Sequence, residues 1–456
     1  MIIHVRNFGK IESADIDVEN MVVFVGENNS GKTYIMQLIY GLLLFLNDVN
    51  NHVEIIKNTD LFSNLVTNKN IEIKSNELEY IQQIQNVVNK YIENCKTELI
   101  KSIFHTKDLT IESLWIEFNE FPFDISLVHE KDIEKSEEYK EIYSIKINDG
   151  ILYKIRFPEY FSEKQIYKTL KRELLDVIIS GLMNFNLVWR GSDVKEIIYL
   201  PASRSGIMLL YANYLSNDNK RDGIDGVEIE TGNDTDKENE YGLTQPVYDF
   251  LMFLLKHKTS EMISDNNKAL IEFINQNIIN GRLEKVGNTV RYVPGESEKS
   301  IPIFLSSSLV SELAPIYQIL SGIQRFKYIM YDEIETCQHP TKQLQLARLL
   351  IRMVNSGYRL IVSTHSDTMA SAINNLITLS LKNKRGELLD RLGYEAEDLI
   401  NADCIRAYQF LINKEGRTVV KEVPGYFSIG VGFDFDIFNK TNDKIYQDAL
   451  ALAEVD

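Results

Sequence analysis

Cysteine and long hydrophobic runs are scarce in this sequence of 456 residues. The three cysteines, Cys95, Cys337 and Cys404, are far apart and lack the spacing of a metal site, which predicts reduced thiols and a cytoplasmic location. No stretch of about 18 apolar residues occurs, because the longest one begins after Gly41 and ends at Asn47. We therefore expect no membrane span and no membrane partner, and the opening MIIHVRNFGK lacks the pattern of a signal peptide.

Proline, glycine and positive charge are also limited. Nine prolines and 23 glycines are too few for a collagen or a long disordered tail. No internal repeat of fixed period occurs, which argues against a solenoid or a propeller. Lys and Arg total 49 against 66 Asp and Glu, so the formal charge is 49 − 66 = −17. This balance argues against a protein that coats DNA along its whole surface, but it leaves a local basic groove open.

The hydrophobic pattern is typical of an α/β fold. Short β-branched segments predict strands at 2–6, 14–18 and 22–25, and an apolar helix at 32–46 follows them. Alternating segments between two helical stretches predict an antiparallel lobe. The other expected strands lie at 114–118, 143–147, 196–201, 283–286, 289–293, 301–305, 328–332 and 360–364, and the other expected helices at 77–104, 162–184 and 244–280. The charged segment 131–143 and the acidic segment 216–240 are expected at the surface.

A glycine-rich loop follows the strand expected at 22–25. Its sequence matches the phosphate-binding pattern G-x-x-x-x-G-K-[ST]. In such a loop, backbone N–H groups and a helix N-terminus bind phosphate oxygens, and the two glycines permit a backbone that a side chain would block. The lysine neutralises phosphate charge, and the hydroxyl that follows it ligates Mg²⁺. The predicted nucleotide-binding residues are Gly26, Glu27, Asn28, Asn29, Ser30, Gly31, Lys32 and Thr33.

Two further motifs follow apolar strands. Asp332 and Glu333 end the segment YIMYDE, at the carboxyl end of a strand, where ligands bind in open α/β sheets. Asp332 is expected to hold Mg²⁺, and Glu333 to act as the general base that polarises the attacking water. His365 follows the strand expected at 360–364, where a neutral imidazole could hydrogen-bond a γ-phosphate or order the water.

Two weaker signals concern serines and an arginine. The segment FLSSSLVSEL places Ser307 and Ser308 at the start of a helix, where hydroxyls and N–H groups either bind an anion or simply cap the helix. Arg204 follows the strand expected at 196–201. It either contacts the nucleotide or transmits its state, or it is a surface arginine of a loop.

Together these motifs resemble the ATPase head of the ABC superfamily, in the soluble branch that includes SMC, RecF and OLD-type proteins. The segment 26–33 resembles Walker A, and Asp332 with Glu333 resembles Walker B and its catalytic carboxylate. His365 resembles the switch histidine. Ser307 and Ser308 resemble the signature motif, although its usual Gly-Gly and Gln are absent. The resemblance covers residues 1–45 and about 195–380 well, and the rest of the chain poorly.

The resemblance implies an α/β fold of the ABC-type P-loop ATPase head, with a mixed sheet, an antiparallel lobe and a helical insertion. The implied ligands are ATP and Mg²⁺, with Thr33 and Asp332 at the metal and Glu333 and His365 as catalytic residues. ATP would lie between Walker A of one head and the signature serines of another. A head-to-tail dimer or a larger ring is therefore expected.

The resemblance also predicts how the chain is divided. Residues 1–47 and 191–384 would form a discontinuous ATPase domain, and 48–190 an insertion. Residues 385–456 would complete the head, because they lack the acidic, glycine-rich pattern of the Toprim nuclease found in OLD proteins. The insertion lacks sustained heptads and a Cys-x-x-Cys hook, which argues against a long SMC-type coiled coil.

Two functions remain open at this point. The chain resembles the stand-alone ATPase of two-component anti-phage systems of the PARIS, Septu and abortive-infection types. It would then be a sensor or scaffold that responds to DNA or to a phage protein and controls a separate effector, expected to be a nuclease. The alternative is a RecF-like DNA-repair ATPase that binds DNA ends or gaps. A transporter subunit fits less well, because such heads are usually about half this length.

Overall fold

The computed structural model describes residues 1–57, 59, 62–63, 65–75, 77–118, 123–130, 139–148, 150–185, 196–208, 242–286, 289–295, 297, 299–383 and 385–453. The chain divides into two compact units, the first made of 1–17 and 38–196, the second of 18–37 and 197–456. The acidic segment 216–240 and most of the charged segment 131–143 lie outside the described residues. The domain boundaries expected at 47, 191 and 384 remain a prediction.

The first unit contains an antiparallel ladder of three strands, in which β1 pairs with both β2 and β5. Alternate residues of β1, including Ile3 and Val5, are buried, as a half-buried strand requires. The helix α4 lies along β5, because the Asn89 side chain exchanges two hydrogen bonds of 2.8 Å with the backbone of Ile116. The elements are β1 (Ile2–Phe8), β2 (Ile11–Asp17), α2 (Val49–Lys57), α3 (Leu65–Asn68), α4 (Leu78–Phe104) and β5 (Ile111–Glu117).

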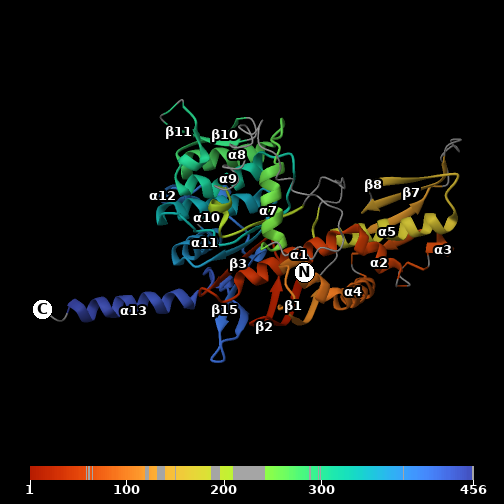
Figure 1. Ribbon diagram of the computed structural model, residues 1–456, viewed down its shortest axis with the longest axis horizontal. Helices are drawn as coiled ribbons and strands as arrows, with labels where there is room; N and C mark the ends of the chain where they lie inside the picture. The colour runs from red at the N-terminus through yellow and green to blue at the C-terminus, as the bar shows by residue number, and fades with distance from the viewer. Residues whose placement is uncertain are drawn as a thin grey trace, which may run out of the picture. The chain divides into compact units, whose positions relative to one another are not determined.

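A second antiparallel sheet in this unit confirms the predicted lobe. Its strand order is β4-β6-β7-β8, and Figure 1 shows β7 and β8 alongside the helix α5. Tyr153 on β8 donates a hydrogen bond of 2.8 Å to Glu173 on α5. The helix begins with a capping box between Ser162 and Gln165, which satisfies two of its free N–H groups. The elements are β4 (Ile71–Ile73), β6 (Ile125–His129), β7 (Tyr139–Ile147), β8 (Gly150–Pro158) and α5 (Glu163–Leu182).

The second unit is built on a mixed sheet in which β16, β15, β3, β14, β13 and β9 lie in that order. The pairs from β15 to β9 are parallel, and β16 is antiparallel to β15. All residues of β3, β13 and β9 are buried, as expected for strands that helices cover on both faces. The strands are β3 (Met21–Gly26), β9 (Ile197–Leu200), β13 (Tyr328–Tyr331), β14 (Arg359–Thr364), β15 (Ile405–Ile412) and β16 (Thr418–Glu422).

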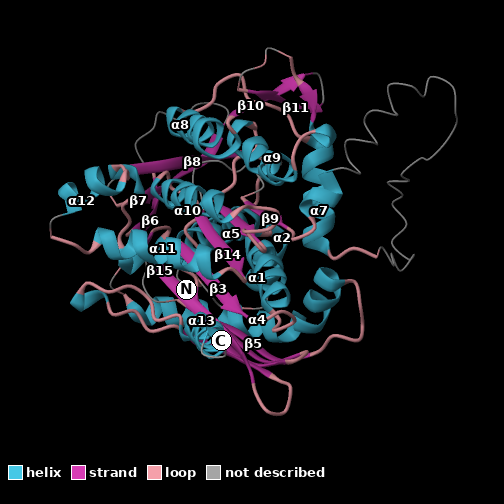
Figure 2. Ribbon diagram, turned by 90° about the vertical axis from the view of Figure 1, so that its left-hand side faces the viewer, coloured by secondary structure: helices cyan, strands magenta, loops and turns pink. Residues whose placement is uncertain are grey.

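The helices of the second unit and the central strands share one hydrophobic core. Figure 2 shows α10 and α11 beside β14 and β3, and Figure 1 shows α13 extending away from the rest of the unit. No helix in the described part of the chain is long and apolar enough to cross a membrane. The helices are α1 (Lys32–Asn47, which continues into the first unit), α7 (Gln245–Lys256), α8 (Asp265–Phe273), α9 (Ser308–Ser321), α10 (Pro340–Asn355), α11 (Asp367–Ser380), α12 (Arg385–Leu392) and α13 (Asp436–Ala453).

One predicted strand is shorter than expected. A small sheet contains β10 (Gly281–Val286), β11 (Thr289–Pro294) and β12 (Ile301–Pro302), so the strand predicted at 301–305 ends at Pro302. The backbone turns into a single 3-10 turn at 303–305 instead. The hydroxyls of Ser306 and Ser311 both donate to the carbonyl oxygen of Ile303, at 2.5 and 3.3 Å, and this local bonding replaces a strand ladder. The α/β class with a mixed sheet and an antiparallel lobe is confirmed.

The packing of α1 against α4 gives a stability prediction. A Cβ added at Gly41 would lie 2.2 Å from the Cγ1 and Cδ1 atoms of Ile103, which is 2% exposed. Overpacking costs roughly 1–3 kcal/mol, which exceeds the gain of about 1 kcal/mol in helix propensity from Gly to Ala. We expect Gly41→Ala to lower the free energy of unfolding in denaturant titration. In an Ile103→Ala background the same change should be neutral or stabilising, and an equal loss in both backgrounds would contradict the packing argument.

Candidate functional site

The glycine-rich loop connects β3 to α1 and has an unusual backbone. Gly26 has a φ of +153° and Gly31 a φ of +96°, conformations that residues with a side chain rarely adopt. A Cβ on Gly26 would also lie 2.9 Å from the Cβ and the carbonyl oxygen of Phe410 on β15. Asn29 has a φ of +57°, which asparagine tolerates better than most residues. Both glycines are therefore required by the shape of the loop.

The ammonium group of Lys32 lies inside this loop. It donates to the carbonyl oxygens of Gly26 and Glu27 at 2.9 Å each, and to the hydroxyl of Ser30 at 3.3 Å. The Nδ1 atom of His365 lies 3.4 Å from it. Lys32 is 4% exposed, so its charge is held by oxygens of the loop itself. Phosphate oxygens could replace these carbonyl oxygens as partners of the same ammonium group.

The carboxylate of Asp332, directly after β13, accepts three hydrogen bonds from side-chain hydroxyls. Its Oδ2 accepts hydrogen bonds of 2.8 Å from the hydroxyls of Thr33 and Tyr199, and its Oδ1 accepts one from Ser363. The residue is 1% exposed. Burial and the neighbouring Asp332 charge raise the pKa of Tyr199 well above its usual value, so that hydroxyl remains a donor.

Glu333 differs sharply from its neighbour. Its φ is +47°, in the left-handed region, and its N–H donates 2.8 Å to the hydroxyl of Ser363. Its side chain is 40% exposed, and its Oε1 lies 3.8 Å from the Nε2 of His365. The structure therefore places a buried carboxylate and an accessible one side by side; their roles as metal ligand and general base stay predictions.

His365 lies between Lys32 and Glu333. It follows β14, and its backbone N–H donates 2.6 Å to the Oε1 of Glu335, which fixes the chain at this point. Burial and the positive charge of Lys32 hold the pKa of the imidazole below its usual value, and the charges of Glu335 and Glu333 oppose that shift only in part. The ring is therefore neutral near pH 7 and has one donor and one acceptor nitrogen.

The predicted serines are not part of this group. Ser307 and Ser308 are exposed at the N-terminus of α9, where Ser307 occupies the cap position without a side-chain capping bond. Among the described residues, no hydrogen bond joins either hydroxyl to the glycine-rich loop. Two large apolar side chains next to them, Phe304 and Leu305, are 46% and 66% exposed. The structure thus brings together the loop, Asp332, Glu333 and His365, but not these serines.

The sequence did not predict the hydrogen-bond donors Tyr199 and Ser363, and it left open whether Arg204 is a surface residue. Tyr199 and Ser363 occupy apolar strands, and their only signal was a polar group at the carboxyl end of a buried strand. Arg204 is not a surface arginine, because it is 0% exposed. Its guanidinium donates 2.7 Å to the carbonyl oxygen of Asp332 and 3.0 Å to that of Glu333. It therefore contacts the backbone of the acidic pair.

The residues present fit a magnesium ion. The Thr33 hydroxyl and the Asp332 carboxylate are oxygen ligands in direct contact at the end of the loop. Mg²⁺ is usually bound by one or two such protein oxygens together with waters and nucleotide phosphates. The pair of Thr33 and Asp332 supplies only one carboxylate. In the described part of the chain, no group of three or more His, Cys, Asp or Glu side chains suited to a metal occurs, so nucleotide phosphates and waters would have to supply the other ligands.

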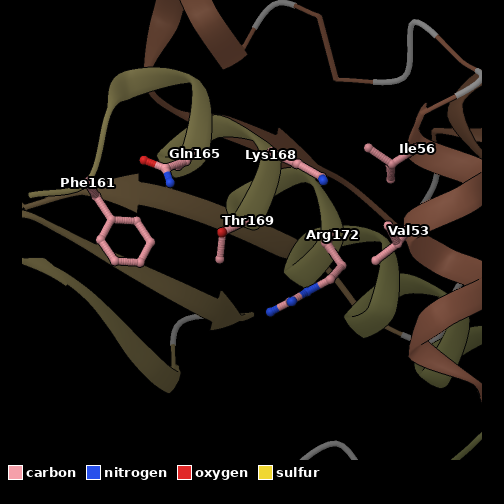
Figure 3. A pocket seen from close by; sticks show the side chains of 7 residues that line it. All are labelled: Val53, Ile56, Phe161, Gln165, Lys168, Thr169 and Arg172. Atoms are coloured by element: carbon pink, nitrogen blue, oxygen red, sulfur yellow. The ribbon is translucent and has the colours of Figure 1, made fainter.

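A separate hollow of about 230 Å³ lies in the first unit, between α2 and α5 (Figure 3). Its basic side chains, Lys168 and Arg172, are four residues apart on α5, and Arg172 is paired with Glu173. None of the residues predicted from the motifs lines it. The lining residues are Val53, Ile56, Phe161, Gln165, Lys168, Thr169 and Arg172.

The position of His365 gives a pH prediction. Because its pKa is lowered, the ring should gain its proton only as the pH falls below about 6.5, the ordinary value for histidine. We expect an NMR titration of the free protein to place the midpoint of this ring below that value. The spectrum of His365→Gln identifies the resonance by its disappearance. A midpoint above the ordinary value would mean that the carboxylates, and not burial and Lys32, dominate.

Comparison with known proteins agrees with this geometry. The profile of a family described as AAA ATPase domain matches residues 1–370, which include the loop, the acidic pair and His365. A search of curated proteins finds no match.

Among solved structures, the chain is similar to three SMC head domains. The first is an SMC head bound to the C-winged helix domain of ScpA, with 11% identity, a TM-score of 0.37 and coverage of 94% of this chain and 99% of that one. The second, from Thermotoga maritima, has 10% identity, a TM-score of 0.33 and coverage of 93% and 98%. The third, with an extended coiled coil and bound to the C-terminal domain of ScpA, derived from Pyrococcus furiosus, has 12% identity, a TM-score of 0.35 and coverage of 97% and 98%.

These low TM-scores add no argument about fold or activity. The family match spans well over half of the sequence and contains the residues that form the site. The chain therefore belongs to the AAA ATPase domain family.

Proposed function

We propose that this chain hydrolyses ATP as an ABC-type head and acts as a nucleotide-switched sensor or scaffold. The observation that carries the ATPase assignment is the contact between Thr33 and Asp332, with Glu333 and His365 beside Lys32. These residues come from three separate parts of the chain. A glycine-rich turn without catalytic function would not require this combination of a buried carboxylate, an exposed carboxylate and a neutral imidazole.

Each residue has a role that its contacts support. The loop N–H groups and the α1 N-terminus would bind phosphate oxygens, and Lys32 would exchange its carbonyl partners for them. Thr33 and Asp332 would hold Mg²⁺, which supplies charge neutralisation at the phosphates when bound. Glu333 would accept a proton from the attacking water, and the neutral His365 ring would hydrogen-bond the γ-phosphate or that water.

We further propose that a second copy of the chain completes the site. Ser307 and Ser308 are exposed at a helix N-terminus, which favours an anion, and the exposed Phe304 and Leu305 beside them favour contact with another protein surface. These serines have no hydrogen bond to the loop of their own chain among the described residues. A head-to-tail dimer or a larger ring would place them at the nucleotide of the neighbouring copy.

The biological role that we propose is anti-phage defence of the OLD-like, abortive-infection type. The ATPase would respond to DNA or to a phage protein in the cytoplasm and control a separate effector, a nuclease. The strands β15 and β16, in the segment 385–456, belong to the same sheet as β3, so we assign these strands to the ATPase head and not to an effector.

Substitutions in the site test the ATPase assignment. Lys32→Ala should abolish ATP binding or turnover, because the charge that meets the phosphates is removed. Glu333→Gln should still bind ATP but hydrolyse it roughly 10²–10⁴-fold more slowly, the usual effect of losing a positioned base. Phosphate release and nucleotide affinity measure both effects. Lys268→Ala, at an exposed residue, is the matched control. Undiminished ATP turnover by the Lys32→Ala variant would contradict the assignment of the loop at 26–33 as the nucleotide-binding site.

The mass of the Glu333→Gln protein tests the assembly and the role. With ATP and Mg²⁺ we expect a dimer or larger ring in light scattering, with or without duplex DNA, because the slow variant accumulates the closed state. An assembly that forms only with DNA would instead support the RecF-like repair function. A monomer under every condition would contradict the shared ATP site.

A further inference from the structure

Arg204 and Glu312 form an ion pair that is completely buried, with both side chains 0% exposed. Arg204 is the largest of the fully buried side chains in the described residues. The Nε atom of the guanidinium contacts the Oε2 of Glu312 on α9. A buried ion pair of this kind contributes little net stability, because the cost of removing both charges from water offsets their attraction. Stability alone therefore does not explain why the pair is present.

Two further contacts of Arg204 reach the acidic pair of the site, and two reach residues close to it in the chain or in the sheet. Its Nη1 donates 3.0 Å to the carbonyl oxygen of Pro201 and 2.7 Å to that of Asp332, and its Nη2 donates 3.0 Å to that of Glu333. The guanidinium also lies 4.4 Å from the ring centre of Tyr331, the last residue of β13. One side chain thus holds two consecutive peptide groups that carry the predicted metal ligand and the predicted general base.

The peptide of Glu333 needs such support. Its φ of +47° is a left-handed conformation that is unfavourable for a residue with a side chain. Three hydrogen bonds hold it: its N–H donates to the Ser363 hydroxyl, and its carbonyl oxygen accepts from Arg204 and, at 3.2 Å, from the backbone N–H of Thr336. Of the groups that hold this backbone, the Arg204 guanidinium is the one paired with α9, so a shift of the guanidinium would change the direction of the Glu333 carboxylate.

Glu312 connects this support to the start of α9. It follows Ser308 by four residues, so the two side chains lie on the same face of the helix, one turn apart. Burial raises the pKa of its carboxyl, and the charge of Arg204 with hydrogen bonds from Ser205 opposes that rise. A shift of the α9 N-terminus would move Glu312, and with it the guanidinium that holds Glu333.

We propose that Arg204 and Glu312 are positioning residues that aim the carboxylate of Glu333 according to the position of the α9 N-terminus. The inference rests on the proposed ATPase function, with Ser307 and Ser308 at the nucleotide of a neighbouring copy. Binding at these serines would then set the general base in its working direction. The ion pair between Arg204 and Glu312 would then couple hydrolysis to assembly without contacting the nucleotide.

The decisive experiment replaces both charges at once. Arg204→Met alone leaves Glu312 buried without its partner and should be strongly destabilising, whereas the pair Arg204→Met with Glu312→Leu removes both charges and should restore much of the thermal stability. The double variant also lacks the bonds to the carbonyl oxygens of Asp332 and Glu333. We expect its ATP affinity to stay within a few-fold of the wild type while kcat falls by about 10²-fold, the usual effect of a small misplacement of a reacting group.

A merely structural role predicts a different result. If the pair only stabilises the fold, turnover should return together with thermal stability in the double variant, and a kcat near the wild-type value would overturn the proposal. Glu312→Gln is the second variant, because it keeps the shape and one acceptor for the guanidinium. It should lower kcat without raising KM, and an unchanged kcat would also overturn the proposal. Arg282→Met, at an exposed arginine of β10, is the control.

A second readout addresses the link to assembly. Wild-type turnover per head should rise with protein concentration as copies associate, whereas the double variant should associate with ATP without the same rise. An equal rise in both proteins would overturn the proposed link. If the wild type shows no turnover that depends on Lys32, the proposed ATPase function is wrong. If the double variant turns over ATP at the wild-type rate, only the positioning role of Arg204 and Glu312 is wrong.

Discussion

The buried carboxylate of Asp332 determines how the parts of the site are arranged. Three hydroxyls converge on it, from Thr33 on α1, Tyr199 on β9 and Ser363 on β14. A buried charge that lost these donors would be left without compensation for the water it gave up, so each of the three elements has a fixed place relative to β13. Lys32 precedes Thr33, Glu333 follows Asp332, and His365 follows Ser363 by two residues, so these three side chains start beside the same contacts. The positions of the site residues are therefore fixed by hydrogen bonds within the buried core.

Adjacent residues in the site carry opposite properties because the backbone turns between them. Asp332 is 1% exposed, whereas the side chain of Glu333 is 40% exposed. The left-handed φ of Glu333 breaks the regular strand and directs the second carboxylate away from the donors of the first. Lys32 and His365 remain close by, and burial together with the positive charge of Lys32 lowers the pKa of the imidazole. The end of one strand thus carries both the predicted metal ligand and the predicted general base.

Much of this arrangement could be predicted because its signals are local. The loop at 26–33, the acidic pair and His365 each follow an apolar segment, and parallel strands bring their carboxyl ends to one edge. Tyr199 and Ser363 could not be assigned, because a tyrosine or a serine in an apolar strand is ordinary until the register is known. The pairing of Arg204 with Glu312 joins a loop to a helix, and no spacing rule predicts such a contact. The strand expected at 301–305 ends at Pro302, because the hydroxyls of Ser306 and Ser311 donate to the carbonyl oxygen of Ile303. Residue composition does not reveal these two hydrogen bonds.

The contact between Thr33 and Asp332 joins residues that are 299 positions apart, and this separation has a consequence for synthesis. At about 5–20 residues per second, a ribosome needs roughly 15–60 seconds to travel from the first of these residues to the second. During that interval the glycine-rich loop already exists, but the carboxylate that holds its threonine does not. The nascent chain therefore passes through a period in which the loop is present without Asp332, Glu333 and His365, and the site is completed late, when β13 and β14 have joined the sheet.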